Sequence, residues 1–288
     1  MQRIRLRYTK RGRLRFTSHR DFQRAFERAL RRAEVPMAYS AGFTPHPKVS
    51  YANAAPTGTG SEAEYLEIAL TEARDPDKLR DLLDESMPVG LDIIEAVEAR
   101  TSGLADRLTA SVWELRLDGV DPAEAERAVE AFKAADAVEV QRKTKNGMRT
   151  FDARAAVASL EASSGSSTAA SSETSSEASS ETSSETSSPQ ADRSSDQACA
   201  ILRLVVRHVT PAVRPDDVLS GLRAVADLAP PVAAAVTRLA QGLFDEETGT
   251  VTDPLAPDRE AVMAVPPSHE EAVAGSAAAK APVPEGPA

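Results

Sequence analysis

The most distinctive short segment of the chain is a stiff loop that carries a histidine beside a lysine. It reads Ala41-Gly42-Phe43-Thr44-Pro45-His46-Pro47-Lys48. Pro45 and Pro47 fix φ on both sides of His46, and Gly42 permits a positive φ. Because an imidazole titrates near neutral pH, His46 is a candidate general acid or base, or a phosphate contact beside Lys48. The alternative is a rigid connector in which His46 packs locally.

Arginine side chains gather near the N-terminus. Residues 1–50 hold 13 Lys and Arg against 3 Asp and Glu, although the whole chain has a net charge of -10. On a helix predicted after Ser18, arginines three or four residues apart share the face opposite the apolar one. We expect them to form one basic surface with the arginines of the preceding strand and to bind a polyanion such as RNA, with a merely solvated face as the alternative. The predicted binding residues are Arg3, Arg5, Arg7, Arg20, Arg24, Arg28 and Arg31, together with Gly42, Phe43, Pro45, His46, Pro47 and Lys48.

A second basic loop, residues 142–145, adds Arg142, Lys143 and Lys145 to the predicted binding set. For catalysis, His19 is a second and weaker candidate beside His46, although the neighbouring Ser18 is explained as a helix cap. The corresponding reaction would be metal-independent RNA cleavage, with a cation stabilising the phosphorane.

Several function classes are excluded by what the sequence lacks. Cys199 is the only cysteine, so the chain has no disulfide framework and no three-cysteine iron–sulfur motif of its own. There is no phosphate-binding glycine loop and no His/Cys metal spacing, and we therefore predict no cofactor and no metal. No apolar run approaches the length of a membrane helix, and Met1 leads directly into an Arg-rich strand, so we expect a cytoplasmic protein that does not enter a membrane.

The spacing of apolar residues predicts the elements that hold these side chains. In residues 1–100 it indicates an alternating strand at 4–8, an amphipathic helix that ends at Pro36, strands near 49–52 and 64–70, a helix at 77–86 and a strand at 91–97. In residues 101–244 it indicates strands at 111–117, 138–142, 201–207 and 235–241, with helices at 122–135 and 215–227. Both halves read β-α-β-β-α-β. The predicted fold is therefore α+β, with two tandem ferredoxin-like units whose separate four-stranded antiparallel sheets each keep one free face.

Two segments are predicted to be disordered and dispensable for folding. Residues 163–197 begin with 14 Ser in the 26 residues from Ser163 to Ser188 and lie as an insertion within the second unit. Residues 245–288 hold nine Asp and Glu, two Lys and Arg, and seven Pro, which is typical of an acidic tail. Neither composition supplies enough apolar surface to offset the chain entropy lost on folding.

The motifs resemble one bacterial family. Ser18-His19-Arg20-Asp21, residues 27–33, residues 42–48, Pro56-Thr57-Gly58 and residues 61–65 are similar to the bacterial radical SAM-linked proteins, a domain family of unknown function. Residues 142–145 and 214–219 resemble later motifs of that family. The long Ser/Glu insertion and the acidic tail depart from its pattern.

The resemblance implies an accessory role beside a B12-binding radical SAM protein. We expect a non-catalytic, substrate-binding partner, with RNA as one substrate class and an unspecified oligomeric state. Two alternatives stay open: a ribonuclease-like enzyme that uses His46, and a protein-interaction module without a nucleic-acid role.

Overall fold

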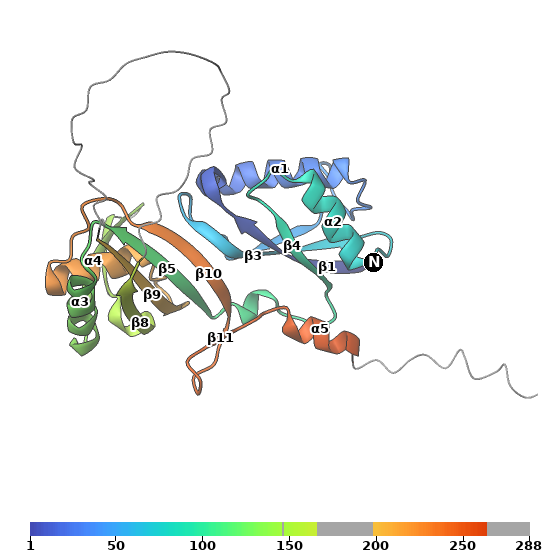
Figure 1. Cartoon of the computed structure of the whole chain (residues 1–288). Helices are drawn as coiled ribbons and strands as arrows, with labels where there is room; N and C mark the ends of the chain where they lie inside the picture. The colour runs from blue at the N-terminus through green and yellow to red at the C-terminus, as the bar shows by residue number, and fades with distance from the viewer. Residues whose placement is uncertain (146, 166–197, 264–288) are drawn as a thin grey trace, which may run out of the picture.

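The computed structural model describes residues 1–145, 147–165 and 198–263. They form an α+β protein built on a mostly antiparallel sheet, with helices packed against it (Figure 1). Most of both predicted disordered segments, 166–197 and 264–288, lies outside the described residues.

The first half contains four strands and two α-helices. Its elements are β1 Gln2–Lys10, the short 3-10 helix η1 Gly12–Phe16, α1 His19–Arg32, β2 Val49–Ala52, β3 Gly60–Leu70, α2 Pro76–Ser86 and β4 Ile93–Glu98. The Ser18 hydroxyl caps α1 by accepting the Asp21 N–H at 3.2 Å, as the sequence predicts. The buried face of α1, with Phe22 and Phe26, packs on the β1 side chains Ile4 and Leu6 in one apolar cluster.

The second half has the same sequence of elements with one hairpin added. Its elements are η2 Ala105–Arg107, β5 Ala110–Asp118, α3 Pro122–Ala134, β6 Glu139–Thr144, β7 Gly147–Asp152, η3 Arg154–Ala156, β8 Val157–Ser164, β9 Cys199–Arg207, α4 Pro215–Ala226 and β10 Ala235–Phe244. A further strand, β11 Val251–Thr252, and helix α5 Ala256–Met263 follow. Leu115, Phe132 and Leu222 bring β5, α3 and α4 into a second apolar cluster.

One nine-stranded sheet joins the two halves, so the prediction of two separate sheets is wrong. The strand order is β4-β1-β3-β10-β5-β9-β8, with β2 also on β3 and β11 on β10. The joint is a short parallel pairing of β3 with β10, in which Gly60 lies opposite Thr237 and Ser61 opposite Arg238. A Cβ on Gly60 would lie 3.1 Å from the Thr237 hydroxyl, so glycine allows this close approach.

The strand predicted at 138–142 is present as β6, but its predicted place in the sheet of the second half is wrong. Within the described residues β6 pairs with β7 in a separate hairpin, and β8 takes the place beside β9. Alternation of apolar and polar residues predicts that a segment is a strand, but it does not predict which other strand it pairs with. Ser163 and Ser164, predicted to start the disordered insertion, instead end β8 opposite Ile201 and Ala200.

The predicted disordered tail begins too early in the chain. Residues 251–263 form β11 and α5, and Leu255 and Asp258 are fully buried. Leu255 packs with Leu104, Leu108 and Tyr65 in a third apolar cluster, which covers one part of the sheet. The prediction of disorder followed the acidic, proline-rich composition and did not take account of these two side chains. Because they are buried, residues 245–263 belong to the fold.

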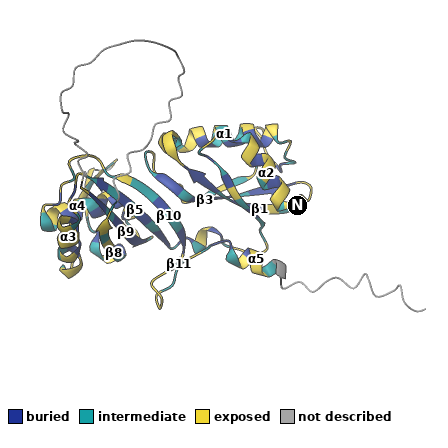
Figure 2. Cartoon of the chain, viewed as in Figure 1, coloured by how far each residue is buried: buried dark blue, intermediate teal, exposed yellow. Residues whose placement is uncertain are grey.

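Exposed residues gather on the outer sides of the helices, while the strands are largely buried (Figure 2). Among the described helices, none is long and apolar enough to cross a membrane.

Candidate functional site

The strand arginines do not join the basic face of α1. Arg3, Arg5 and Arg7 alternate with the β1 residues that pack under α1, so they point to the opposite side of the sheet. Arg3 pairs with Glu67 at 3.3 Å, and the Arg7 Nε donates to the Glu62 carbonyl at 2.9 Å. The prediction of one continuous basic surface from strand and helix is therefore wrong.

Arg5 is a structural residue. It is 1% exposed, and its Nε lies 2.9 Å from Glu67 while its Nη1 donates to Asp258 of α5. Burial opposes ionisation of Asp258, but hydrogen bonds from Thr101 and Arg5 outweigh it and hold the pKa of Asp258 below its usual value. The buried pair therefore fastens α5 to β1 and leaves Arg5 unable to contact a phosphate.

The arginines of α1 do lie on one exposed face. Arg20, Arg24, Arg28 and Arg31 are all exposed on the side away from the apolar cluster. Arg24 lies 3.8 Å from Asp21. Because this ion pair is exposed, it contributes little to the stability of the fold. The exposed side chains of Arg15 and Phe16 stack on each other in the preceding η1. This α1 basic face, defined by its four arginines, can contact a polyanion.

The histidine loop stands beside this face. Gly42 has φ +141°, which favours glycine, and Phe43 is fully exposed. Pro45, His46 and Pro47 help to line a hollow of about 390 Å³. Lys48 is exposed and continues into β2.

Arg31 lines the same hollow as His46, together with the carboxylates Glu27 and Glu34. His19 lies elsewhere, with its ring against Tyr51 at 4.8 Å and its Nε2 3.2 Å from Gln23. The structure therefore does not bring the two candidate catalytic histidines together.

The second predicted basic loop is partly structural. Arg142 pairs with Asp217 of α4 at 2.5 Å and donates to the Ala212 carbonyl at 3.0 Å. It ties the β6–β7 hairpin to the start of α4 and is not free for a ligand. Lys143 and Lys145 are exposed.

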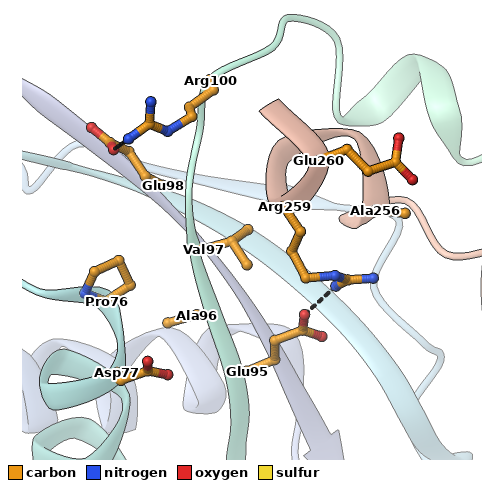
Figure 3. Close-up of a pocket in the computed structure, with 10 residues that line it drawn as sticks. All are labelled: Pro76, Asp77, Glu95, Ala96, Val97, Glu98, Arg100, Ala256, Arg259 and Glu260. Carbon is orange, nitrogen blue, oxygen red and sulfur yellow. Dashed lines mark hydrogen bonds and ion pairs between the residues drawn. The ribbon is translucent and has the colours of Figure 1, made fainter. Parts of the chain in front are cut away.

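An open groove of about 740 Å³ lies between α2, β4 and α5 (Figure 3). Its lining includes Asp77, Glu95, Glu98 and Glu260 but also Arg100 and Arg259. Arg259 pairs with Glu95, and Arg100 lies 2.7 Å from Glu98. Each of the two arginines of the groove is therefore already paired with a carboxylate of its lining.

A second cavity, of about 390 Å³, lies where the two halves meet, and we call it the junction cavity. It is lined by residues 53, 54 and 56 from the loop after β2, by Leu108, by Trp113 of β5, by Val206 and His208 at the end of β9, by residues 212–215 before and at the start of α4, and by Arg238 of β10. No carboxylate is part of this lining. Both halves of the chain thus build its wall.

Arg238 is the central charged group of the junction cavity. It is 2% exposed, its guanidinium lies 4.9 Å from the Trp113 ring centre, and its Nη1 donates to the Asn53 carbonyl at 2.7 Å. Glu64 lies 3.7 Å from its Nη2. Burial lowers the pKa of Arg238, and Glu64 opposes that shift. Within the described residues, Arg238 Nε and Glu64 Oε1 are buried without a hydrogen-bond partner.

His208 forms the polar end of the same cavity. Its Nδ1 lies 2.6 Å from the Leu108 carbonyl, which can only accept, so Nδ1 carries the proton. Its Nε2 then accepts from the Ser111 hydroxyl at 2.7 Å. Burial, assisted by the cation Arg238, lowers the pKa of His208 and keeps the imidazole neutral at neutral pH.

The Ser111–His208 pair resembles a nucleophile and its base, but its geometry does not fit that role. Ser111 is fully buried and does not line the junction cavity, so its hydroxyl cannot reach a bound ligand. The described residues also contain no group of His, Cys, Asp or Glu that could hold a metal ion. The arrangement is suited to binding through cations, an aromatic ring and a neutral imidazole.

Sequence reasoning missed every central residue of the junction cavity. Arg238 and Trp113 lie on strands whose pairing was not predicted as part of one sheet, and His208 follows β9 without a motif. The only available signals were an arginine within an apolar strand and the motif that begins at Arg214, which lines the cavity.

The described residues thus form a mixed α+β protein with a mostly antiparallel sheet. A family model described as "Uncharacterized protein conserved in bacteria (DUF2344)" matches residues 3–215, and the chain belongs to this family. Among curated proteins, none matches the chain.

Proposed function

We propose that the protein is a non-catalytic accessory protein that binds a substrate for a radical SAM partner, and that RNA is the substrate class it holds on the α1 basic face. The radical SAM link rests on the resemblance of the motifs. The observation that carries the binding role is the exposed row Arg20, Arg24, Arg28 and Arg31, of which only Arg24 has an ion pair among the described residues.

The α1 basic face is long enough to follow a nucleic-acid backbone. Residues 20–31 span about 16 Å along a helix. Phe16 and Phe43, both exposed, lie on segments next to the ends of α1 in sequence and offer rings for base stacking. Salt-dependent binding through phosphates is the expected mode.

We also propose that each half is a ferredoxin-like unit and that the chain arose by duplication. In the first half β1 lies between β4 and β3, and β2 lies on the far side of β3. In the second half β5 lies between β10 and β9, and β8 lies on the far side of β9. The same strand order in both halves supports the proposal.

Co-purification is the direct test of the accessory role. The full chain, isolated from native extract under anaerobic and low-salt conditions, should bring a radical SAM enzyme with it. Recovery of the protein alone under these conditions would count against that partner, whereas RNA binding by the purified chain can be measured separately.

A ribonuclease role for His46 is the second candidate, because His46 and Arg31 line one hollow. It requires cleavage of structured RNA without divalent metal and loss of cleavage in His46→Ala. If RNA survives incubation with metal-free wild-type protein, this alternative is rejected. A protein-interaction module is the remaining outcome, in which neither RNA binding nor cleavage is found.

A further inference from the structure

The junction cavity combines cationic groups with an apolar wall. Lys10, Arg214 and Arg238 lie in or directly beside it, and Glu64 is the carboxylate that faces Arg238. The Lys10 ammonium is nearly buried and donates to the Pro56 carbonyl, which belongs to a lining residue. Three cations against one carboxylate make the local charge positive.

We propose that the junction cavity binds a small organic anion, with its carboxylate or phosphate group between Arg214 and Arg238 and its apolar or planar body against Trp113. This proposal is independent of the α1 basic face and of a radical SAM partner. It identifies a site that uses both halves of the chain.

The size and lining of the junction cavity fit such a ligand. A volume of about 390 Å³ falls within the range of small-molecule sites, which are mostly apolar with a few polar groups. Trp113, Leu108, Val206 and Val213 supply the apolar wall. A nucleic-acid strand would need an open groove.

The unpaired polar atoms show that the protein does not satisfy this site by itself. The Arg238 Nε–H is buried without an acceptor within the described residues, and such a group costs free energy unless it is paired. An anionic oxygen at this guanidinium would supply the missing acceptor. The 3.7 Å separation of Arg238 and Glu64 allows the guanidinium to shift toward a ligand.

The rim of the cavity adds a second cation that is not engaged in an ion pair there. Arg214 is exposed and immediately precedes α4, whose N-terminus carries a partial positive charge. On α4, the carboxylate of Asp217 is already paired with Arg142. Arg214 can therefore close on an anion held by Arg238.

Trp113 reports on this site directly, because it is the only tryptophan of the chain and is 7% exposed. We would titrate the full chain with phenyl phosphate and follow tryptophan emission. A saturable change is expected. Inorganic phosphate, which lacks the ring, should bind more weakly, and benzylamine, which carries the opposite charge on a similar ring, should not bind.

Two matched variants locate the binding. Arg214→Gln should weaken phenyl phosphate binding about tenfold, because a charge-assisted contact is lost. Arg223→Gln, an exposed arginine further along α4, should leave it unchanged. The double variant Arg20→Glu/Arg28→Glu should also leave it unchanged, which separates this site from RNA binding on α1.

The proposal is overturned by any of three results. One is the absence of a saturable change in tryptophan emission up to about 10 mM phenyl phosphate, because a dissociation constant above that concentration would be too weak for specific binding. Another is an equal loss of affinity in Arg214→Gln and Arg223→Gln. The third is binding of benzylamine as tight as that of phenyl phosphate.

Discussion

His208 has both ring nitrogens in hydrogen bonds, to Ser111 and to the Leu108 carbonyl, and protonation of its imidazole opposes folding. In the folded protein its Nε2 accepts from Ser111 and its surroundings contain the cation Arg238, so its pKa lies below the usual value of 6.5. The unfolded chain therefore binds a proton at a higher pH than the folded chain does. The contribution of neutral His208 to the free energy of unfolding is therefore complete above the pKa that His208 has in the unfolded chain. It is lost as the pH falls through the lower pKa that His208 has in the folded protein.

We predict that the free energy of unfolding decreases as the pH is lowered from about 6.5 toward 5, and that His208→Gln reduces this decrease. Urea unfolding at a series of pH values measures it. His19→Gln is the matched control for the loss of a histidine, because the ring of His19 contacts Tyr51 and Gln23 rather than the Ser111–Leu108 pair. The same pH dependence in wild type and His208→Gln would contradict the assignment.

Arg5 and Asp258 form an ion pair in which both side chains are buried. Asp258→Asn leaves the Arg5 guanidinium with a weaker set of partners, and we expect a loss of about 3 kcal/mol in the free energy of unfolding. Chemical denaturation measures the loss. Glu98→Gln, which breaks a half-exposed pair with Arg100, should cost less than about 1 kcal/mol. Equal losses in the two variants would show that Asp258 is not the central anchor.

At the scale of elements, α1 has two faces with different roles. Phe22, Phe26 and Leu30 are buried against β1, while Arg20 and Arg28 are exposed and have no ion pair among the described residues. Substitutions on the exposed face should therefore alter binding without altering stability. This separation makes α1 a suitable element for testing the RNA proposal.

We predict that the full chain binds single-stranded RNA with a log-log salt slope near −3, taking about −0.7 for each of four phosphate contacts. Arg20→Glu/Arg28→Glu should weaken binding and reduce the magnitude of the slope by about 1.4. Filter binding or fluorescence anisotropy from about 50 to 200 mM salt measures both quantities.

The control for this experiment is Arg127→Glu/Arg223→Glu, which reverses two exposed arginines on α3 and α4. It should change the net charge equally without removing contacts at α1. If both double variants lower the slope alike, general electrostatic attraction rather than the α1 basic face is responsible.

At the scale of the whole molecule, the chain after β10 returns to the first half and holds it. β11 pairs with β10, Leu255 packs with Leu104 and Leu108, and Asp258 reaches Arg5 of β1. The last described helix thus contacts the first strand. This long-range closure means that residues 245–263 are part of the folded unit.

We predict that two C-terminal truncations will behave differently. Deleting 264–288 should leave the melting temperature nearly unchanged, in keeping with the composition of that segment. Deleting 245–288 should lower it by more than several degrees, because it exposes the third apolar cluster and leaves Arg5 buried without Asp258. Differential scanning calorimetry measures both. Equal melting temperatures would show that α5 does not stabilise the fold.

The sequence by itself determined the local elements. The alternation of Ile4 and Leu6 with arginines specified β1, and the Ser18 cap with the spacing of Phe22 and Phe26 specified α1 and its exposed basic face. These features depend on residues a few positions apart, where side-chain periodicity and capping decide the backbone conformation. The histidine loop was likewise identified from its glycine and prolines.

Only the tertiary structure decided which elements meet. The pairing of β3 with β10 created the junction cavity, placed Arg238 between Glu64 and Trp113, and turned Arg5 from a predicted phosphate contact into a buried partner of Asp258. Alternation fixes which side chains share a face of a strand, but it does not specify the neighbouring strand or what covers that face. The partners of Arg5 and Arg238 are 62 to 253 residues away along the chain, and contacts at that separation are set by the packing of the whole fold.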